Sequence, residues 1–215
     1  MTSTTIVVLI SGNGSNLQSI IDAIESKQLD ARLAAVISNN PDAYGLTRAK
    51  NHGVETHQID HRQYASRETF DEGLLDCIQK YDPDYIVLAG FMRILSSAFI
   101  QAYQNKILNI HPSLLPHYKG LDTHRRVLEN GEPEHGVSIH LVTPELDDGP
   151  VLMQGRYPIK ADDTLSDLQQ KGHALEHQMY PQLLQYLSQQ RLQINNQSIT
   201  FDHQPLHQPI EFTNN

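Results

Sequence analysis

The stretch TIVVLISGNGSNLQSIIDAIES, residues 5–26, combines a strand, a glycine-rich turn and a helix in one short run. Its first part, Thr5–Ile10, is almost continuously apolar, which is typical of a strand covered on both faces of a parallel sheet. Its last part, residues 15–26, repeats apolar residues at helical spacing. A buried strand followed at once by a helix is the unit from which doubly wound α/β folds are built.

The same alternation continues through the first half of the chain. Further strands are predicted at residues 33–38 (LAAVIS), 55–59 (ETHQI), 84–89 (DYIVLA) and 106–110 (KILNI). Further helices are predicted at residues 67–81 and 96–103. We therefore expect a doubly wound α/β fold, with a mostly parallel central sheet and helices on both faces.

The pattern changes in the second half. GVSIHLVT (136–143) and PVLMQGRYPI (150–159) are consecutive apolar runs with a short connection, so antiparallel strands are expected there. A long helix is predicted at about residues 164–189. We expect a single domain over residues 1–190, followed by a short hairpin and a loose tail over residues 191–215.

The composition is that of a soluble globular protein. Of the 215 residues, 39% are hydrophobic and 19% are charged, and the net charge is −9. We see no basic patch, so nucleic acid is not an expected partner. We see no leader and no apolar run of membrane length, so we expect a cytoplasmic protein without membrane contact. The single cysteine, Cys77, excludes an intrachain disulfide and is expected to be a buried thiol.

The glycine-rich turn SGNGSNL, Ser11–Leu17, has the features of an anion-binding turn. Gly12 and Gly14 allow a tight turn, and the free N–H groups at the start of the following helix can hold a negative charge. The third glycine of a dinucleotide fingerprint would fall at Leu17. The turn therefore favours a single phosphate over a dinucleotide, and a plain strand-to-helix turn is the remaining alternative.

A second marked stretch, LNIHPSLLP (108–116), places an amide and an imidazole at the end of a strand. Asn109 and His111 are alternate residues and face the same side of a strand, and two prolines make the following loop rigid. Asp147 lies in a turn, ELDDGP (145–150), that follows another strand. Because ligands bind at the carboxyl ends of the strands in open sheets, we expect these side chains to converge.

An amide, a histidine and a carboxylate suit acyl transfer to an amine. The tetrahedral intermediate needs a donor for its oxyanion, and protons must move from the attacking amine to the leaving nitrogen. No serine or cysteine nucleophile is needed if the amine attacks directly.

These stretches strongly resemble the phosphoribosylglycinamide formyltransferase family, the folate-dependent enzymes of purine synthesis. The resemblance covers about residues 5–190 in the right order. The matching stretches are VVLISGNGSNLQ (7–18), IVLAGFMRIL (86–95), LNIHPSLLP (108–116), LENGEPEHGVSIH (128–140) and ELDDGPV (145–151). Methionyl-tRNA formyltransferase looks similar but carries an additional C-terminal domain, and formyltetrahydrofolate hydrolase carries an N-terminal regulatory domain. We expect neither domain here.

The resemblance implies a role for each matching residue. Asn109, His111 and Asp147 match the catalytic set. The residues implied to bind the ribonucleotide are Gly14, Ser15, Asn16, His173, Ala174, Leu175 and Glu176. The residues implied to bind the folate are Arg67, Met92, Arg93, Ile94, Leu95, Asn109, Thr143, Pro144, Glu145, Leu146 and Asp147. A separate expectation is that the N-terminal half forms the nucleotide and phosphate side, and the C-terminal half forms the folate side.

The resemblance also implies a mechanism and its partners. The glycinamide amine attacks the formyl carbon of 10-formyltetrahydrofolate, and Asn109 and protonated His111 stabilise the oxyanion. Asp147 pairs with His111 and orders a water that relays protons to the departing folate nitrogen. The expected partners are these small-molecule substrates, no metal is expected, and the protein is either a monomer or a homodimer.

Two alternatives of other classes are considered. HALEH (173–177) fits the H-x-x-E-H pattern of inverted zinc proteases, whose two histidines share a helix face. That site needs a third ligand downstream, where Glu211 and a few other residues stand in a loose stretch. A binding module that keeps the fold without chemistry is the second alternative, and the intact Asn–His–Asp set argues against it.

Two residues near the expected site have an open role. His140 is either a supporting residue of the site or a plain strand residue. Asp148 stands where relatives usually have glycine or alanine, directly after Asp147. It is either a solvated carboxylate or close enough to move the pH–rate profile to higher pH, because a nearby negative charge favours protonation.

Overall fold

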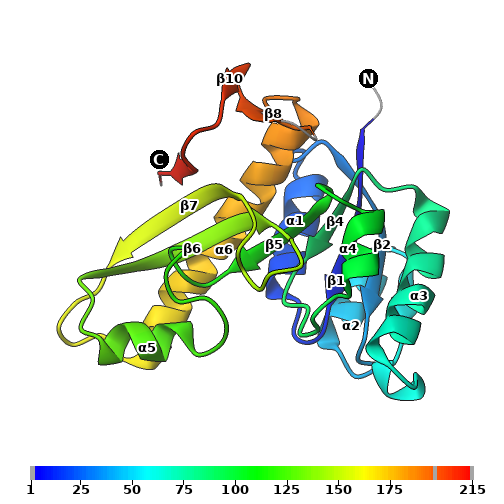
Figure 1. The fold of residues 1–215 in the computed structure, drawn as a ribbon, viewed down its shortest axis with the longest axis horizontal. Coiled ribbons are helices and arrows are strands. Elements are labelled where there is room, and N and C mark those ends of the chain that lie inside the picture. The colour runs from blue at the N-terminus through cyan, green and yellow to red at the C-terminus, as the bar shows by residue number, and fades with distance from the viewer. Residues whose placement is uncertain (1–2, 196–197, 214–215) are drawn as a thin grey trace.

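The computed structural model describes residues 3–195 and 198–213, and a large sheet lies at its centre (Figure 1). The strands of this sheet are β1 (Thr4–Ile10), β2 (Ala31–Ser38), β3 (Thr56–Gln58), β4 (Tyr85–Leu88), β5 (Ile107–His111), β6 (Glu134–Leu141), β7 (Val151–Pro158) and β11 (Ile210–Phe212). Their order across the sheet is β11-β7-β6-β5-β4-β1-β2-β3. The strands from β3 to β5 are parallel, which confirms the doubly wound fold.

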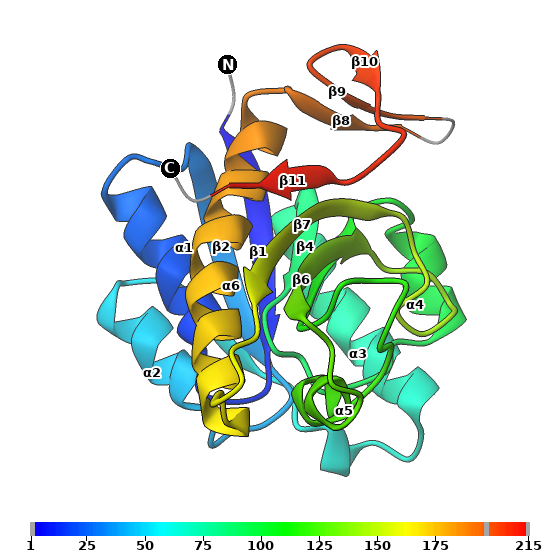
Figure 2. The same ribbon diagram turned by 90° about the vertical axis from the view of Figure 1, so that its left-hand side faces the viewer.

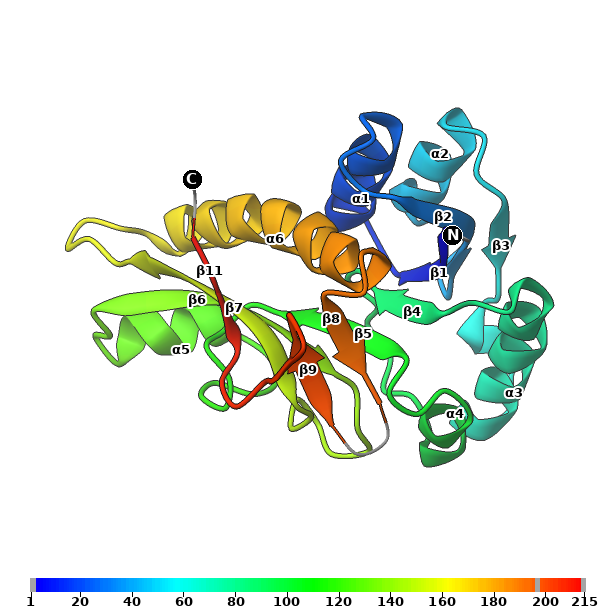
Figure 3. The ribbon, with the colours of Figure 1, turned by 90° about the horizontal axis from the view of Figure 1, so that it is seen from above.

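Helices cover both faces of the sheet (Figures 2 and 3). One face carries α1 (Ser15–Glu25), α2 (Tyr44–Asn51) and α6 (Leu165–Ser188), and the other carries α3 (Arg67–Ile78) and α4 (Ser97–Ala102). The remaining short helices are α5 (Thr123–Glu129), η1 (His61–Gln63) and η2 (Gln79–Tyr81). The figures show α1, α2 and α6 grouped on one side of the strands, and α3 and α4 on the opposite side.

The first strand shows why this arrangement is stable. Ile6, Val8 and Ile10 belong to the core on the α1 and α6 face, whereas Val7 and Leu9 belong to the core on the α3 face. All five side chains are fully buried. Successive residues of a strand point to opposite faces, so a continuous apolar run is needed to fill two cores at once.

Two α-helices are not predicted by the sequence pattern. α2 and α5 are short, and each ends within about two turns. Leu46 and Ala49 of α2 and Val127 of α5 are buried, so tertiary packing stabilises helices that are too short to be stable alone.

The expected antiparallel strands are present in the C-terminal half, and their direction changes one expectation. β6 pairs antiparallel with β5, with Leu141 opposite Leu108 and Ser138 opposite His111. The end of β6 therefore lies beside the start of β5, away from His111. The premise that ELDDGP follows a strand ending at the same edge as β5 is wrong. The segment 142–150 must instead return along the sheet to bring Asp147 to His111.

The C-terminal segment is more regular than the expected hairpin and loose tail. A small antiparallel sheet contains β8 (Leu192–Ile194), β9 (Ile199–Phe201) and β10 (Gln204–Pro205), and it lies at the opposite end of the molecule from α5 (Figure 2). β11 then adds to the edge of the main sheet, parallel to β7. Ile210 and Phe212 pack against the core, which gives this short strand its stability. Residues 214–215 lie outside the described part.

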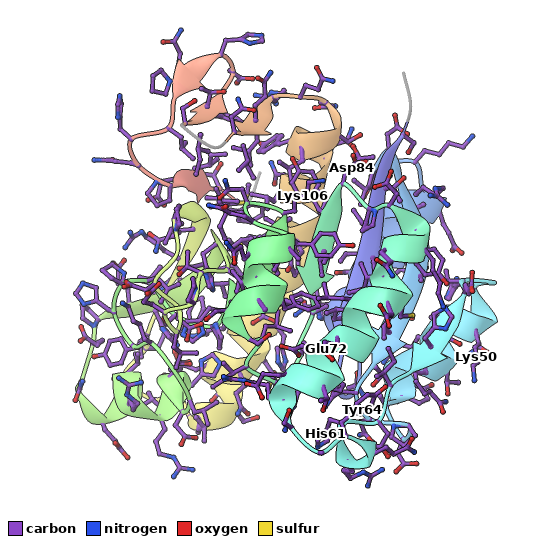
Figure 4. The ribbon with its side chains drawn as sticks, turned by 45° about the vertical axis from the view of Figure 1, so that its right-hand side comes forward. Lys50, His61, Tyr64, Glu72, Asp84 and Lys106 are labelled. Carbon is purple, nitrogen blue, oxygen red and sulfur yellow. The ribbon has the colours of Figure 1, made fainter. Side chains whose placement is uncertain are left out.

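The two ends of the parallel strands are well separated. Asp84 and Lys106, which directly precede β4 and β5, lie at one end of the sheet, and His61, which follows β3, lies at the other (Figure 4). The loops that follow β1, β2 and β4 also leave from this second end.

Candidate active site

A cavity of about 750 Å³ opens where β4 and β5 end. Its walls are residues 90–95, the end of β5, the segment 120–125 and the segment 142–147, with His140 and two α6 side chains. Asn109, His111 and Asp147 all line it, so the three expected catalytic side chains converge from distant parts of the chain.

The backbone fixes the protonation pattern of His111. Its Nε2 is 3.0 Å from the carbonyl oxygen of Tyr118, and a carbonyl oxygen only accepts, so Nε2 carries the hydrogen. Its Nδ1 faces Asp147 Oδ2 at 3.5 Å. In the doubly protonated ring, the hydrogen on Nδ1 would lie between the ring and this carboxylate.

Asn109 is oriented by His140. The Nδ1 of His140 donates to the carbonyl oxygen of Leu141 at 2.9 Å, so Nε2 of the neutral ring accepts from Asn109 Nδ2 at 3.1 Å. Burial lowers the pKa of His140, which favours this neutral form. Asp147 Oδ1 lies 3.7 Å from the same nitrogen. Of the two roles left open for His140, the geometry favours support of the site.

The return of the segment 142–150 depends on its backbone. Asp147 has a φ of 50°, in the left-handed region, and its Oδ2 accepts a hydrogen bond from Gly120 N at 2.9 Å. A Cβ on Gly149 would lie 1.8 Å from the carbonyl oxygen of Leu141, so only glycine fits there. The tight fold at Gly149 lets the chain reverse onto the cavity.

Asp148 points to a different partner from Asp147. Its carboxylate forms an ion pair with Lys119 Nζ, and its side chain is 53% exposed. The charge is therefore paired and solvated, which favours the first of the two roles considered for this residue.

A buried polar network holds the loop that follows His111. Ser138 Oγ donates to the carbonyl oxygen of Ser113 at 2.6 Å and accepts from Leu115 N at 3.0 Å. Gln154 Nε2 donates to the carbonyl oxygen of Leu115 at 2.8 Å. These residues escaped the sequence analysis, although a serine and a glutamine inside apolar strands are a usable signal, because buried polar groups need partners.

The glycine-rich turn lies outside the walls of this cavity, at the start of α1. Gly14 has a φ of 75°, and a Cβ there would lie 2.7 Å from Gly45 Cα, so the turn packs closely against α2. Arg48 of α2 donates to the carbonyl oxygen of Asn13 at 2.9 Å. Glycine has no side chain to cap α1, so the N–H groups of Ser15 and Asn16 at the helix start are suited to an anion.

The glycine-rich turn contacts residues 173–176 of α6, which are expected to bind the ribonucleotide, through a buried hydrogen bond. Asn16 Nδ2 donates to Glu176 Oε2 at 2.8 Å, although the two residues are 160 positions apart. Burial raises the pKa of Glu176. Asn16 Oδ1 is buried and has no hydrogen-bond partner among the residues that the structure describes. His173 and Ala174 are exposed beside this pair, whereas Leu175 belongs to the core.

Most of the expected folate residues line the cavity, and Arg67 is the exception. Met92, Ile94 and Leu146 line it with exposed apolar side chains, and Leu95 lines it as a buried residue. The guanidinium of Arg93 lies 5.9 Å from the ring centre of Phe70, and Thr143, Pro144 and Glu145 also line the cavity. Arg67 does not line it; this side chain is half-exposed at the start of α3, 3.5 Å from Glu68.

A histidine of the cavity wall, His124, is paired with a second histidine behind it, and the sequence did not predict this pair. His135 Nε2 lies 3.0 Å from His124 Nδ1, and His124 faces the cavity. Burial lowers the pKa of each of the two to about 4. A Cβ on Gly172 would lie 3.1 Å from His124, so this glycine lets α6 approach the pair.

The described residues contain no group of three or more potential ligands that could hold a metal ion. In HALEH the rings of His173 and His177 are stacked 6.2 Å apart, but the Glu176 carboxylate points to Asn16. Among the helices of the described part, none is long and apolar enough to cross a membrane.

Comparisons with known proteins show which family this chain resembles. A family model described as "Formyl transferase" matches residues 4–184. The phosphoribosylglycinamide formyltransferase of Escherichia coli (strain K12) is 49% identical over 201 residues, which are 94% of this chain and 95% of that protein. The human trifunctional purine biosynthetic protein adenosine-3 is 39% identical over 189 residues, which are 88% of this chain and 19% of that protein.

Solved structures give the same result. The phosphoribosylglycinamide formyltransferase of Coxiella burnetii, in complex with CHES, has a TM-score of 0.94 and 49% sequence identity. That alignment covers 99% of this chain and 100% of the other. Glycinamide ribonucleotide transformylase 1 of Symbiobacterium toebii has a TM-score of 0.88 at 40% identity, covering 93% of this chain and 94% of the other.

Proposed function

This chain belongs to the phosphoribosylglycinamide formyltransferase family of folate-dependent enzymes, and from that membership we propose the details of its reaction. Formyl transfer in purine biosynthesis is the activity of the family. In the proposed reaction, the amine of phosphoribosylglycinamide attacks the formyl carbon of 10-formyltetrahydrofolate directly. The products are the N-formyl ribonucleotide and tetrahydrofolate.

The oxyanion of the tetrahedral intermediate would be held by Asn109 and His111. An amide nitrogen carries two hydrogens, and Asn109 Nδ2 uses one for His140, so one remains for the formyl oxygen. His111, once protonated at Nδ1, would supply a positive charge beside the oxyanion, while Asp147 faces that nitrogen. Both groups are held by neighbours before the substrate arrives, which is the condition for strong electrostatic stabilisation.

Asp147 would stabilise the protonated ring and help to move protons. It lies beside His111 and accepts from Gly120 N, so its position is fixed from two sides. A water ordered by this carboxylate would carry a proton from the attacking amine to the leaving folate nitrogen. The reaction as proposed requires no metal.

The two substrates would bind next to each other at the carboxyl ends of the parallel strands. The phosphate fits the N–H groups at the start of α1, with Glu176 and His173 beside it for the rest of the ribonucleotide. The folate fits the 750 Å³ cavity, whose exposed Met92, Ile94 and Leu146 offer apolar surface to a flat ring. Residues 1–190 would then act as one formyltransferase domain, whose partners are small molecules.

The observation that carries this proposal is the convergence of Asn109, His111 and Asp147 in one cavity. The test is an assay with 10-formyltetrahydrofolate and phosphoribosylglycinamide, following the folate absorbance and the formylated product. We expect product only when both substrates are present. Release of formate without the ribonucleotide would indicate a hydrolase instead, and no consumption of the folate would contradict the proposed function.

A further inference from the structure

Ser11 joins the glycine-rich turn to the cavity loop. It directly follows β1, which lies between β2 and β4 in the sheet. Its N–H donates to the carbonyl oxygen of Gly90 at 3.1 Å, and its carbonyl oxygen accepts from Asn40 Nδ2 at 3.2 Å. The segment that begins the turn is thus bonded to the loops that follow both neighbouring strands.

The hydroxyl of Ser11 makes the most direct link. Its Oγ accepts a hydrogen bond from Met92 N at 2.7 Å and donates to Asn39 Oδ1 at 2.5 Å. The direction is fixed, because a backbone N–H only donates. Asn39 is buried, and its Nδ2 lies 3.2 Å from His61 Nδ1, at the end of the sheet where Figure 4 shows His61.

The short path from Ser11 to Gly14 is held at each step. Gly12 O accepts from Gly45 N at 3.1 Å, and Asn13 is held by Arg48. The segment from Ser11 to Gly14 is therefore held in place. If a ligand moves the N–H groups at the start of α1, the movement is transmitted to Ser11. At the other end of the path, Met92 belongs to the wall of the folate cavity.

We propose that Ser11 is a positioning residue that couples the two substrate sites. An anion at the glycine-rich turn and a folate in the cavity would each favour the same arrangement of Ser11 and Met92, so each raises the affinity for the other. By linkage the two factors must be equal. This inference rests on the proposed function, because it takes the turn as the ribonucleotide site and the cavity as the folate site.

The test measures the affinity for a folate analogue with carbon in place of N10, which cannot complete formyl transfer. Calorimetric titrations are made with the protein alone and with the protein saturated with phosphoribosylglycinamide. In the wild-type protein the ribonucleotide is expected to raise this affinity by about 5-fold or more, the usual lower range for coupled sites. Ser11→Ala should bring the factor close to one, and Ser11→Thr, which keeps a hydroxyl, should retain most of it.

A matched control removes a different anchor of the same loop. Ser96 N donates to Asp71 Oδ2 at 2.5 Å, on the side of the loop facing α3. Asp71→Ala should weaken binding of the analogue, while the factor gained from the ribonucleotide stays at the wild-type value. Thermal unfolding of each variant shows whether it is folded.

The outcomes separate the coupling from the function. A wild-type factor close to one, an unchanged factor in Ser11→Ala, or an equal loss in Asp71→Ala would overturn the coupling. None of these three results would contradict formyl transfer by the wild-type protein. A wild-type protein that transfers no formyl group would instead overturn the proposed function, and this is measured first.

Discussion

Asp147 carries two tasks that a single substitution can separate. Its Oδ2 accepts from Gly120 N, which orders the loop, and its charge lies beside His111 Nδ1. Asp147→Asn keeps an oxygen for Gly120 but removes the negative charge beside the ring. Turnover should fall by ~10²-fold or more, the range for a lost proton-transfer or oxyanion group. Affinity for the ribonucleotide, measured by calorimetry, should change by less than ~3-fold, and a large loss there would contradict the assigned role.

Asp148 is neutralised by Lys119, so removing the two charges together should matter little. Exposed ion pairs contribute about 0–1 kcal/mol, and the double variant Asp148→Gly, Lys119→Met should leave the pH–rate profile superimposable on that of the wild type. Lys119→Met is the informative partner variant, because it leaves an unpaired negative charge beside Asp147. Its profile should move to higher pH at low salt and return as salt is added. A shifted profile in the double variant would show that the two charges of the pair do not cancel at the site.

At the scale of elements, the sequence predicts apolar strands well, but it does not predict how the segment 142–150 folds back onto the cavity. Continuous apolar runs define β1, β2 and β4, because only such runs fill two cores. The alternate spacing of Asn109 and His111 also predicts their common face. The position of Asp147 could not be derived in this way, since it depends on the antiparallel direction of β6 and on the reversal at Gly149. α5 was missed because its stability comes from contacts with distant residues.

The pair of His124 in α5 and His135 in β6 predicts a pH-dependent stability. His124 and His135 have pKa values of about 4 in the folded protein, below the usual 6.5, because burial disfavours the charged rings. The unfolded chain therefore binds protons more readily, and stability falls as pH drops from ~6.5 to about 4. Calorimetric melting between pH 7.5 and 4.5 should show a smaller loss for the double variant His124→Leu, His135→Leu than for the wild type. If the melting temperature of the double variant falls with pH as much as that of the wild type, the histidine pair is not the cause of the pH dependence.

At the scale of the whole molecule, one end of the sheet carries the chemistry and the other carries the C-terminal segment. The cavity lies at the carboxyl ends of β4 and β5, while the small sheet of β8, β9 and β10 lies at the end opposite α5 (Figures 1 and 2). The general position of the site follows from the topology rule for open sheets. The course of the C-terminal segment does not, because its strands are two or three residues long and carry few apolar side chains.

This separation predicts that stability and activity respond differently to changes in β11. Ile210 and Phe212 face the same side of the strand and pack against the core, whereas Glu211 between them is exposed and lies 3.5 Å from Arg156. Replacing both apolar residues by serine removes two half-buried side chains, about 2 kcal/mol in total. For a chain of this length that corresponds to a fall of ~4–8 °C in Tm. Turnover below the transition should stay within ~2-fold of the wild type, because no residue of β11 lines the cavity.

Glu211→Ser is the matched control for this double variant. It changes the same strand on the opposite face, and it should lower Tm by less than ~2 °C, since an exposed ion pair contributes little. The double variant should also associate more readily at high concentration, because a weakened β11 exposes the edge of β7 to other chains. Light scattering measures this association. An unchanged Tm in the double variant would show that β11 is not bound to the sheet in solution, and a loss of turnover as large as that of Asp147→Asn would show that the C-terminal segment supports the cavity after all.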